Sequence, residues 1–146
     1  MKSRDVLLYF IYLPVEKTNI LSPIQIMKGM FLIKQELKIE DFYQFQPYLY
    51  GPCSFEVYSD LRNLINEGLV LGVPSIRGWL YYKITHMGEE KAKEISLTFT
   101  EELIAGIENI KKLVMQKDLF ELLKYVYQKY PEYATHSIIN IGELQK

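Results

Sequence analysis

The chain has 146 residues, with 17 lysines and arginines, 18 aspartates and glutamates, and a formal net charge of -1. Its 49% hydrophobic residues suffice for a folded core, which excludes disorder as the dominant state. One cysteine and two histidines leave neither an internal disulfide nor an ordinary zinc site, so no cofactor is predicted. The longest apolar run, residues 6–13, is too short to cross a membrane, and residues 1–5 lack a signal-peptide pattern; we expect a cytoplasmic protein.

Two helices are predicted in the first quarter of the chain. Residues 4–13 are almost continuously apolar and stop before Pro14, which favours a buried first helix. Residues 22–25 read serine, proline, isoleucine and glutamine, the pattern of a capping box with proline at the first helical position. Apolar residues then recur at helical spacing to about Leu37, so the second helix is expected to pack against the first.

The segment 38–52 is rich in aromatic residues. Tyr43, Phe45 and Pro47 share one parity, which predicts a short extended piece and makes it a candidate for the minor strand of a winged-helix sheet. Packing in the core and at a hinge is the preferred role of the rings. A base-stacking platform would need several rings exposed together on a basic surface.

Residues 54–67 predict the helix around which the chain is organised. Ser54 is a good N-cap, and Gly68 is expected in the left-handed position of a Schellman motif, with Leu69 in contact with Leu64. One side of this helix is apolar and the other is polar, so the polar side is available to a partner. The polar side comprises Glu56, Ser59, Asn63 and Asn66, flanked by Phe55 and Arg62.

Two strands joined by a turn are predicted directly after this helix. LVLGV at 69–73 and WLYYKIT at 79–85 have strand composition, and PSIRG at 74–78 forms the turn. In the second strand Leu80, Tyr82 and Ile84 are expected to face the core. A helix followed by a hairpin is the order of a winged helix-turn-helix.

Three further helices are predicted after the hairpin. The first is capped by Thr85 and has a charged, solvated face, the second starts after Thr100, and the third starts at Asp118 with a capping box. The last two carry apolar stripes. They either fold back on the first two helices or pair with a second chain, and dimerisation is favoured. The inward residues of the last helix are expected to be Leu119, Leu122, Leu123 and Val126.

The predicted fold is mainly α-helical with a small β-hairpin, namely a winged helix-turn-helix with C-terminal helices. Its expected organisation is a winged helix-turn-helix domain at residues 1–96, a helical dimerisation extension at 97–134, and a tail at 135–146 without a usable pattern.

Several of these segments together resemble a known group of proteins. The segments are PIQIMKGMFLI, FQPYLYGPCSFEVYSDLRNLINEGLV and YYKITHMGEEKA, which span most of residues 22–92. They resemble prokaryotic winged-helix proteins, among them archaeal regulators and, more remotely, phage-associated proteins of the SocA-like antitoxin (Panacea) type. Gly29 after Lys28 and Cys53 before Ser54 depart from that pattern. The resemblance implies a regulatory or adaptor role rather than an enzymatic one.

The function predicted first is a DNA-binding transcriptional regulator, acting as a homodimer on a near-palindromic double-stranded site. In this interpretation Ser59 and Asn63 reach base edges, and Arg62 contacts a phosphate or a guanine. Arg77 at the hairpin tip contacts a neighbouring phosphate or the minor groove, as does Lys83. The candidate DNA-binding residues are therefore Ser59, Arg62, Asn63, Arg77 and Lys83.

Charge argues against DNA binding. Residues 54–85 contain as many acidic as basic side chains, and acids near phosphates repel them. The residues in this balance are Arg62, Arg77 and Lys83 against Glu56, Asp60 and Glu67. A basic patch assembled in space from Lys2, Arg4, Lys28, Lys34 and the hairpin would change that balance.

Three other functions are weighed. The second hypothesis is a protein-interaction module such as an antitoxin or adaptor, which docks through the same helix or through the aromatic segment. The third is an effector-sensing regulator with a small-molecule pocket between the aromatic segment and the C-terminal helices. Catalysis is not predicted: Cys53 with His86 or His136 forms no recognisable arrangement, and a buried thiol is preferred. Neither a phosphate-binding glycine loop nor paired carboxylates are found.

Overall fold

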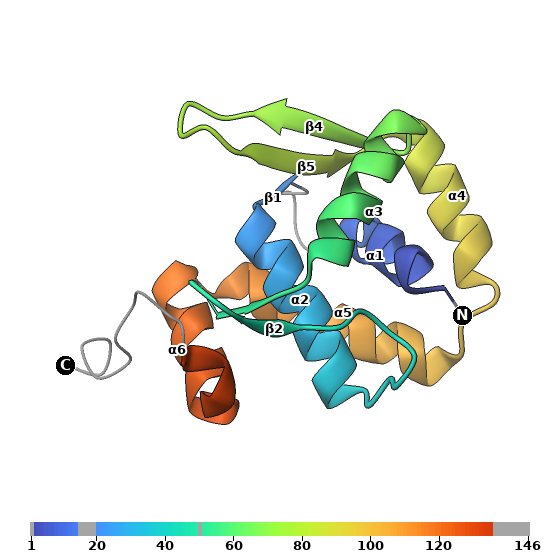
Figure 1. Cartoon of the computed structure of the whole chain (residues 1–146). Helices are drawn as coiled ribbons and strands as arrows, with labels where there is room; N and C mark the ends of the chain where they lie inside the picture. The colour runs from blue at the N-terminus through green and yellow to red at the C-terminus, as the bar shows by residue number, and fades with distance from the viewer. Residues whose placement is uncertain (1, 15–19, 50, 136–146) are drawn as a thin grey trace.

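The computed structural model describes residues 2–14, 20–49 and 51–135, and these residues are mainly helical (Figure 1). The predicted tail, with His136, lies outside the described residues from position 136 onward. The helices are α1 (Ser3–Tyr12), α2 (Pro23–Glu36), α3 (Phe55–Asn66), α4 (His86–Ser96), α5 (Glu101–Gln116), α6 (Leu119–Lys129) and the 3-10 helix η1 (Pro131–Ala134). The strands are β1 (Ile20–Leu21), β2 (Gln46–Tyr48), β3 (Gly51–Cys53), β4 (Val70–Pro74) and β5 (Leu80–Ile84).

The N-terminal caps of four helices follow directly from the sequence. The side chains of Ser22, Thr85, Thr100 and Asp118 each accept a hydrogen bond from a backbone N–H three residues later. At Ser22 and Asp118 the reciprocal bond is also present, so both predicted capping boxes are confirmed.

The two ends of α3 differ in how well the sequence predicts them. The Schellman motif is confirmed: Gly68 has φ +79, and the Leu69 N–H donates to the Leu64 carbonyl at 2.9 Å. The predicted cap is wrong, because the Ser54 hydroxyl makes no cap hydrogen bond. The side chain is turned into the core, where it is 2% exposed and its oxygen has no hydrogen-bond partner.

The larger sheet has the order β1-β5-β4 and contains the predicted hairpin. Its third strand is β1, in which Ile20 pairs with Lys83 and Leu21 with Tyr82. The prediction that residues 43–47 supply this strand is wrong, since β2 pairs with β3 in a separate two-stranded sheet. β1 takes this place because it lies between α1 and α2 in the chain, and the buried side chain of Leu21 holds it beside β5.

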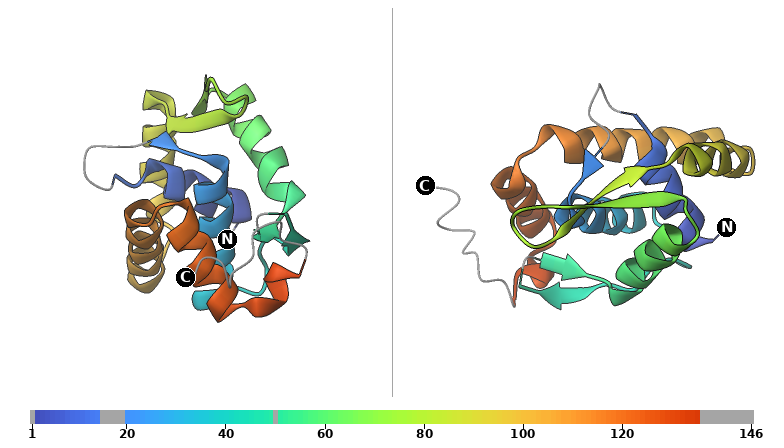
Figure 2. Two further views of the ribbon diagram at one scale, coloured as in Figure 1. Left: turned by 90° about the vertical axis from the view of Figure 1, so that its left-hand side faces the viewer. Right: turned by 90° about the horizontal axis from the view of Figure 1, so that it is seen from above.

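Helices α5 and α6 fold back on the N-terminal helices of the same chain. Their buried residues belong to one core with those of α1 and α2, beneath the hairpin (Figures 1 and 2). The apolar stripes therefore need no second chain, which removes the argument for dimerisation through residues 97–134; a homodimer stays a prediction. The covered residues are Ile107, Ile110 and Val114 of α5 and Leu122, Leu123 and Val126 of α6. Leu119, expected to face inward, is 39% exposed.

The aromatic segment packs against α2 and the C-terminal end of the fold. The Phe31 ring makes edge contacts with Phe45, Tyr130 and Tyr133, with centroids 5.4, 5.1 and 4.6 Å apart. These contacts join the aromatic segment to Tyr130 and to Tyr133 of η1; the effector pocket considered in this region stays a prediction. In the described part of the chain, no helix has the length and apolar character needed to span a membrane.

Candidate nucleic-acid interface

The outer side of α3 is polar and open to solvent. Val57, Leu61 and Leu64 are buried and fix the orientation of the helix. At about 100° per residue, the side opposite to them carries residues that are all exposed. These are Phe55, Ser59, Arg62, Asn63 and Asn66. Arg62 donates to the Ser59 hydroxyl at 3.1 Å, so three of the predicted site residues lie together on one surface.

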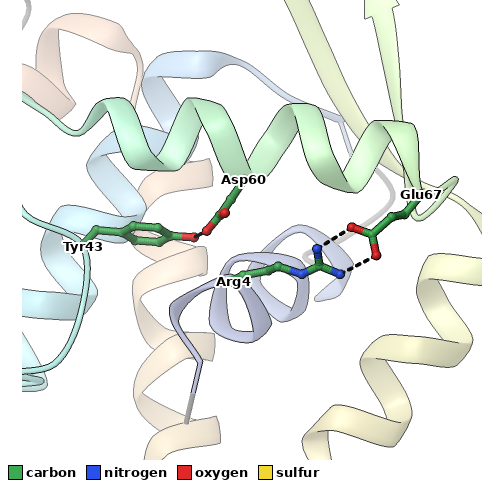
Figure 3. A network of polar contacts seen from close by, with 4 residues as sticks. All are labelled: Arg4, Tyr43, Asp60 and Glu67. Atoms are coloured by element: carbon green, nitrogen blue, oxygen red, sulfur yellow. Dashed lines mark hydrogen bonds and ion pairs between the residues drawn. The ribbon is translucent and has the colours of Figure 1, made fainter.

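The acidic residues of α3 lie on one flank and have partners. The Tyr43 hydroxyl donates to Asp60 at 2.6 Å, and the Arg4 guanidinium forms a bidentate ion pair with Glu67 (Figure 3). The bond to Arg4 holds the pKa of the Glu67 carboxyl below its usual range. Burial and the Asp60 carboxylate raise the pKa of Tyr43, which keeps the phenol protonated. Glu56 accepts the Gln44 N–H at 3.3 Å.

The other flank of α3 faces the hairpin. The Ile65 side chain lies so close to Gly72 of β4 that a Cβ there would be 3.2 Å from it. Burial raises the pKa of Tyr82 in β5, and the nearby Arg62 opposes that shift. The basic residue of α3 is therefore on the hairpin side, whereas the acids are on the side of the aromatic segment and α1. The zero charge balance of residues 54–85 conceals this separation.

Arg77 lies at the exposed tip of the hairpin. The turn is held by the Ser75 hydroxyl, which donates to the Trp79 carbonyl at 2.8 Å and accepts the Arg77 N–H at 3.3 Å. The Arg77 guanidinium lies 5.9 Å from the centre of the Trp79 ring. Within the described residues it forms no ion pair, and its neighbour Ile76 is fully exposed. The tip thus presents a cation and an apolar side chain to solvent.

Lys83 lies on a different surface from the other predicted residues. Tyr82 and Ile84 are buried, and successive side chains in a strand point to opposite faces. Lys83 therefore projects from the outer face of the sheet, whereas α3 packs beside the inner face. The structure brings Ser59, Arg62 and Asn63 together and places Lys83 apart from them.

Two of the described lysines are buried, which the sequence patterns did not predict. Lys111 is fully buried, donates to the Phe10 and Ile11 carbonyls at the end of α1, and lies 4.9 Å from the Phe10 ring. The helical partner of the Phe10 carbonyl would be the N–H of Pro14, which proline lacks, so Lys111 supplies the missing donor. Burial lowers the pKa of Lys111 to about 7. The sequence signal that could have predicted this is Pro14, four residues after Phe10, because it leaves the Phe10 carbonyl in need of another donor.

Lys28 is the second buried lysine, and it cannot join a surface patch. It is 2% exposed, its amine lies 3.4 Å from the Pro52 carbonyl, and burial lowers its pKa to about 7. Lys34 donates to the Tyr43 carbonyl at 2.7 Å, and Arg4 pairs with Glu67. Three members of the basic patch considered from the sequence therefore have partners within the chain.

Cys53 is a buried thiol, 7% exposed, whose pKa is raised by burial. In the ranges that the structure describes, no three histidine, cysteine, aspartate or glutamate side chains gather into a group that could hold a metal ion.

Comparisons with known proteins give no family for this chain. No protein-family model matches it, and no characterised protein is significantly similar to it in sequence. The resemblance to winged-helix regulators and to SocA-like antitoxins therefore remains an expectation, and the functional argument depends on the site itself.

Proposed function

We propose that the protein binds double-stranded DNA as a winged helix, with α3 in the major groove and the β4–β5 hairpin as the wing. The observation that carries this proposal is the exposed surface of α3, where Ser59, Arg62 and Asn63 lie beside the hairpin. The tip of that hairpin carries Arg77, which forms no ion pair with any described residue. Because Asp60 and Glu67 are held on the opposite flank, the repulsion expected from the sequence is reduced.

The order of the elements supports the same function. Helix α1, strand β1, helices α2 and α3, and the β4–β5 hairpin follow one another as in a winged helix, with β1 joining the hairpin at β5. The β2–β3 hairpin is an insertion between α2 and α3. In this arrangement α3 is the helix that reads DNA.

Each residue has a distinct role in the proposed complex. Asn63 and Ser59 are short hydrogen-bonding side chains that suit base edges, and Arg62 suits a guanine or a phosphate. Arg77 suits a phosphate or the minor groove beside the α3 site. Lys83, on the outer face of the sheet, contacts DNA only if the duplex bends around the hairpin.

The test is selection of sites from a random double-stranded library, followed by fluorescence anisotropy at low and high salt. We expect affinity that falls steeply with salt, because each phosphate contact releases counterions. The double variant Arg62→Ala, Arg77→Ala should bind at least about tenfold more weakly. The control Lys93→Ala, Lys112→Ala removes the same charge from exposed positions on α4 and α5. Absence of binding at low salt, or equal affinity of both double variants, would contradict the proposal.

A protein-interaction module is the second candidate, and one surface favours it. Tyr48, Leu49 and Phe55 are 46%, 43% and 55% exposed at the start of α3, and the rings of Tyr48 and Phe55 pack edge to face. Exposed apolar residues grouped in this way are typical of protein interfaces. A protein partner that is lost in Phe55→Ser, in a chain that fails to bind DNA, would support this function.

A further inference from the structure

A cleft of about 660 Å³ lies between the β4–β5 hairpin and the helical body. Residues 79–82 of the hairpin form one side, and the first turn of α2 and the start of α6 form the other. Tyr58 of α3 also lines it. In Figure 1 the β4–β5 hairpin extends to the left above α2 and α6. The volume is in the range of sites for small organic ligands.

The cleft exposes large apolar side chains. Trp79, Leu80 and Leu119 are 40%, 38% and 39% exposed, and all three line it. They come from two elements that are distant in the sequence, so the exposed apolar surface is assembled by the fold. Such a surface on both sides of one cleft favours a bound apolar group.

The edge of β5 remains open along the cleft. β1 ends at Leu21, opposite Tyr82, and α2 begins at Pro23, so among the described residues no strand continues beside Leu80. The Ser75 N–H donates to the Trp79 carbonyl, which shows that Trp79 directs its backbone groups toward β4. By alternation, Leu80 directs its N–H and carbonyl away from β4, to the cleft side. A ligand there would meet polar backbone groups as well as rings.

The charge around the cleft is positive. Arg77 and Lys117 both line it, and neither forms an ion pair within the described ranges. The Asp118 carboxylate, which also lines it, accepts the Glu121 N–H in the capping box of α6. The N-terminal ends of α2 and α6 add partial positive charge. The two cations each lie near a ring, Arg77 at 5.9 Å from the centre of Trp79 and Lys117 at 5.6 Å from the centre of Tyr125. Neither contact neutralises the charge, so the pair complements an anion that has an apolar body.

We propose that this cleft binds a small aromatic carboxylate, with its ring against Trp79 and Leu119 and its carboxylate between Arg77 and Lys117. If the protein binds DNA as proposed above, the ligand competes with phosphate for Arg77 and lowers DNA affinity. The same coupling requires that DNA lower the affinity for the ligand. The regulatory part depends on the proposed function, whereas binding in the cleft does not.

Trp79 is the only tryptophan in the chain, so its fluorescence reports directly on the cleft. The full chain is titrated with phenylbutyrate and with the neutral phenylbutyramide, which differs only in the charged group. We expect a saturable change with phenylbutyrate and an affinity for the amide about tenfold lower, because two charge-assisted contacts are lost. Equal affinities, or no saturation with phenylbutyrate, would overturn the proposal.

Two variants locate the site. Leu119→Glu puts a carboxylate in the cleft and should weaken phenylbutyrate binding at least about tenfold; an acidic residue in the first turn of α6 suits the helix dipole. Leu97→Glu makes the same change at an 85% exposed leucine after α4 and should bind as the wild type. If Leu119→Glu does not fold, Lys117→Gln tests the site in its place. It should weaken phenylbutyrate binding, whereas its control Lys93→Gln should bind as the wild type.

The remaining outcomes separate this site from other occupants. Wild-type binding by both Leu119→Glu and Lys117→Gln would overturn the proposal. A dimer that Leu119→Glu converts to a monomer in light scattering would also overturn it, because the cleft would then be covered by a second copy. Anisotropy with DNA is measured separately with and without phenylbutyrate. Failure to bind DNA therefore rejects the proposed function while the Trp79 titration still tests the cleft.

Discussion

The helical body, formed by α1, α2, α5 and α6, differs sharply from the unit formed by α3 and the β4–β5 hairpin. In the body apolar stripes are covered, and two basic side chains have partners within the chain. Lys111 donates to the end of α1, and Lys129 pairs with Glu36 at 2.6 Å. In the α3–hairpin unit, Arg77 has no ion-pair partner among the described residues, and Trp79 and Phe55 are substantially exposed.

This difference indicates that side chains of the helical body mainly stabilise the fold, whereas those of the α3–hairpin unit are available to a partner. Polar groups removed from water cost free energy unless they are hydrogen-bonded, so the partners of Lys111 are structural. An exposed arginine or tryptophan adds little to folding and remains available for binding. Substitutions should therefore separate the two regions, with large effects on stability in the body and small ones on the surface of α3.

The largest effect is expected at Lys111 in the body. Lys111→Met keeps much of the side-chain length but leaves the Phe10 and Ile11 carbonyls without the amine that they accept from. At pH 9, where the folded amine is neutral, we expect the free energy of unfolding to fall by about 3 kcal/mol, measured by urea denaturation. The adjacent Lys112→Met, at an exposed position, is the control and should change it by less than about 0.5 kcal/mol. Equal stability of the two variants would show that the contacts of Lys111 do not stabilise the body.

The pH dependence of stability gives a second, smaller effect in the body. The pKa of Lys111 is about 7 in the folded chain and 10.5 in the unfolded chain. Between these values the unfolded chain binds more protons, so the free energy of unfolding rises with pH. Lys28 shifts in the same direction. From pH 7 to 9, Lys111→Met should lower this slope by about 1 kcal/mol per pH unit.

Above about pH 9 other groups titrate, so the rise of stability with pH is expected to end there. Burial raises the pKa of Cys53 above its usual value of 9.0, so at higher pH this thiol contributes in the opposite direction. Denaturation series at several pH values give the slope. Lys112→Met should retain the wild-type slope, and a slope that is flat in the wild type would show that Lys111 stays charged.

Two serines at helix starts, one a cap and one not, are expected to differ by about 1 kcal/mol in their effect on stability. Ser22, at the start of α2 in the body, accepts the Gln25 N–H, whereas the Ser54 hydroxyl at the start of α3 has no partner. Ser22→Ala should lower the free energy of unfolding by about 1 kcal/mol. Ser54→Ala removes an unsatisfied buried hydroxyl and should be neutral or slightly stabilising. Thermal and urea denaturation compare the pair, and equal losses would mean that Ser54 does cap α3.

The smallest effect on stability is expected on the outer surface of α3. Arg62→Ala and Asn63→Ala remove exposed side chains, so each should change the free energy of unfolding by less than about 0.5 kcal/mol. If α3 reads DNA, the same variants lose affinity. A variant that loses stability and affinity in parallel would show that its effect on binding is a folding effect.

Much of the local structure could be predicted because its causes lie within a few residues. The capping boxes at Ser22 and Asp118 and the Schellman motif at Gly68 depend on short-range hydrogen bonds, and the structure confirms them. The hairpin is confirmed for the same reason: alternation and turn residues are local. The exposed positions of Ser59, Arg62 and Asn63 follow from helical periodicity around a buried stripe.

The features that were missed depend on residues far apart in the sequence. The third strand is β1 rather than residues 43–47, because the packing of α1 and α2 decides which segment lies beside β5. The sequence left open whether α5 and α6 cover the body or a second chain, since an apolar stripe does not specify what it packs against.

By itself, then, the sequence determined the helices, most of their ends, the hairpin and a polar surface on α3. The tertiary structure decided which charges have partners. It places Arg4 beside Glu67, Tyr43 beside Asp60, and Lys111 at the end of α1, and it leaves Arg77 unpaired among the described residues. Charge counts cannot give this result, because the interaction of two charges depends on their distance and burial in the folded chain.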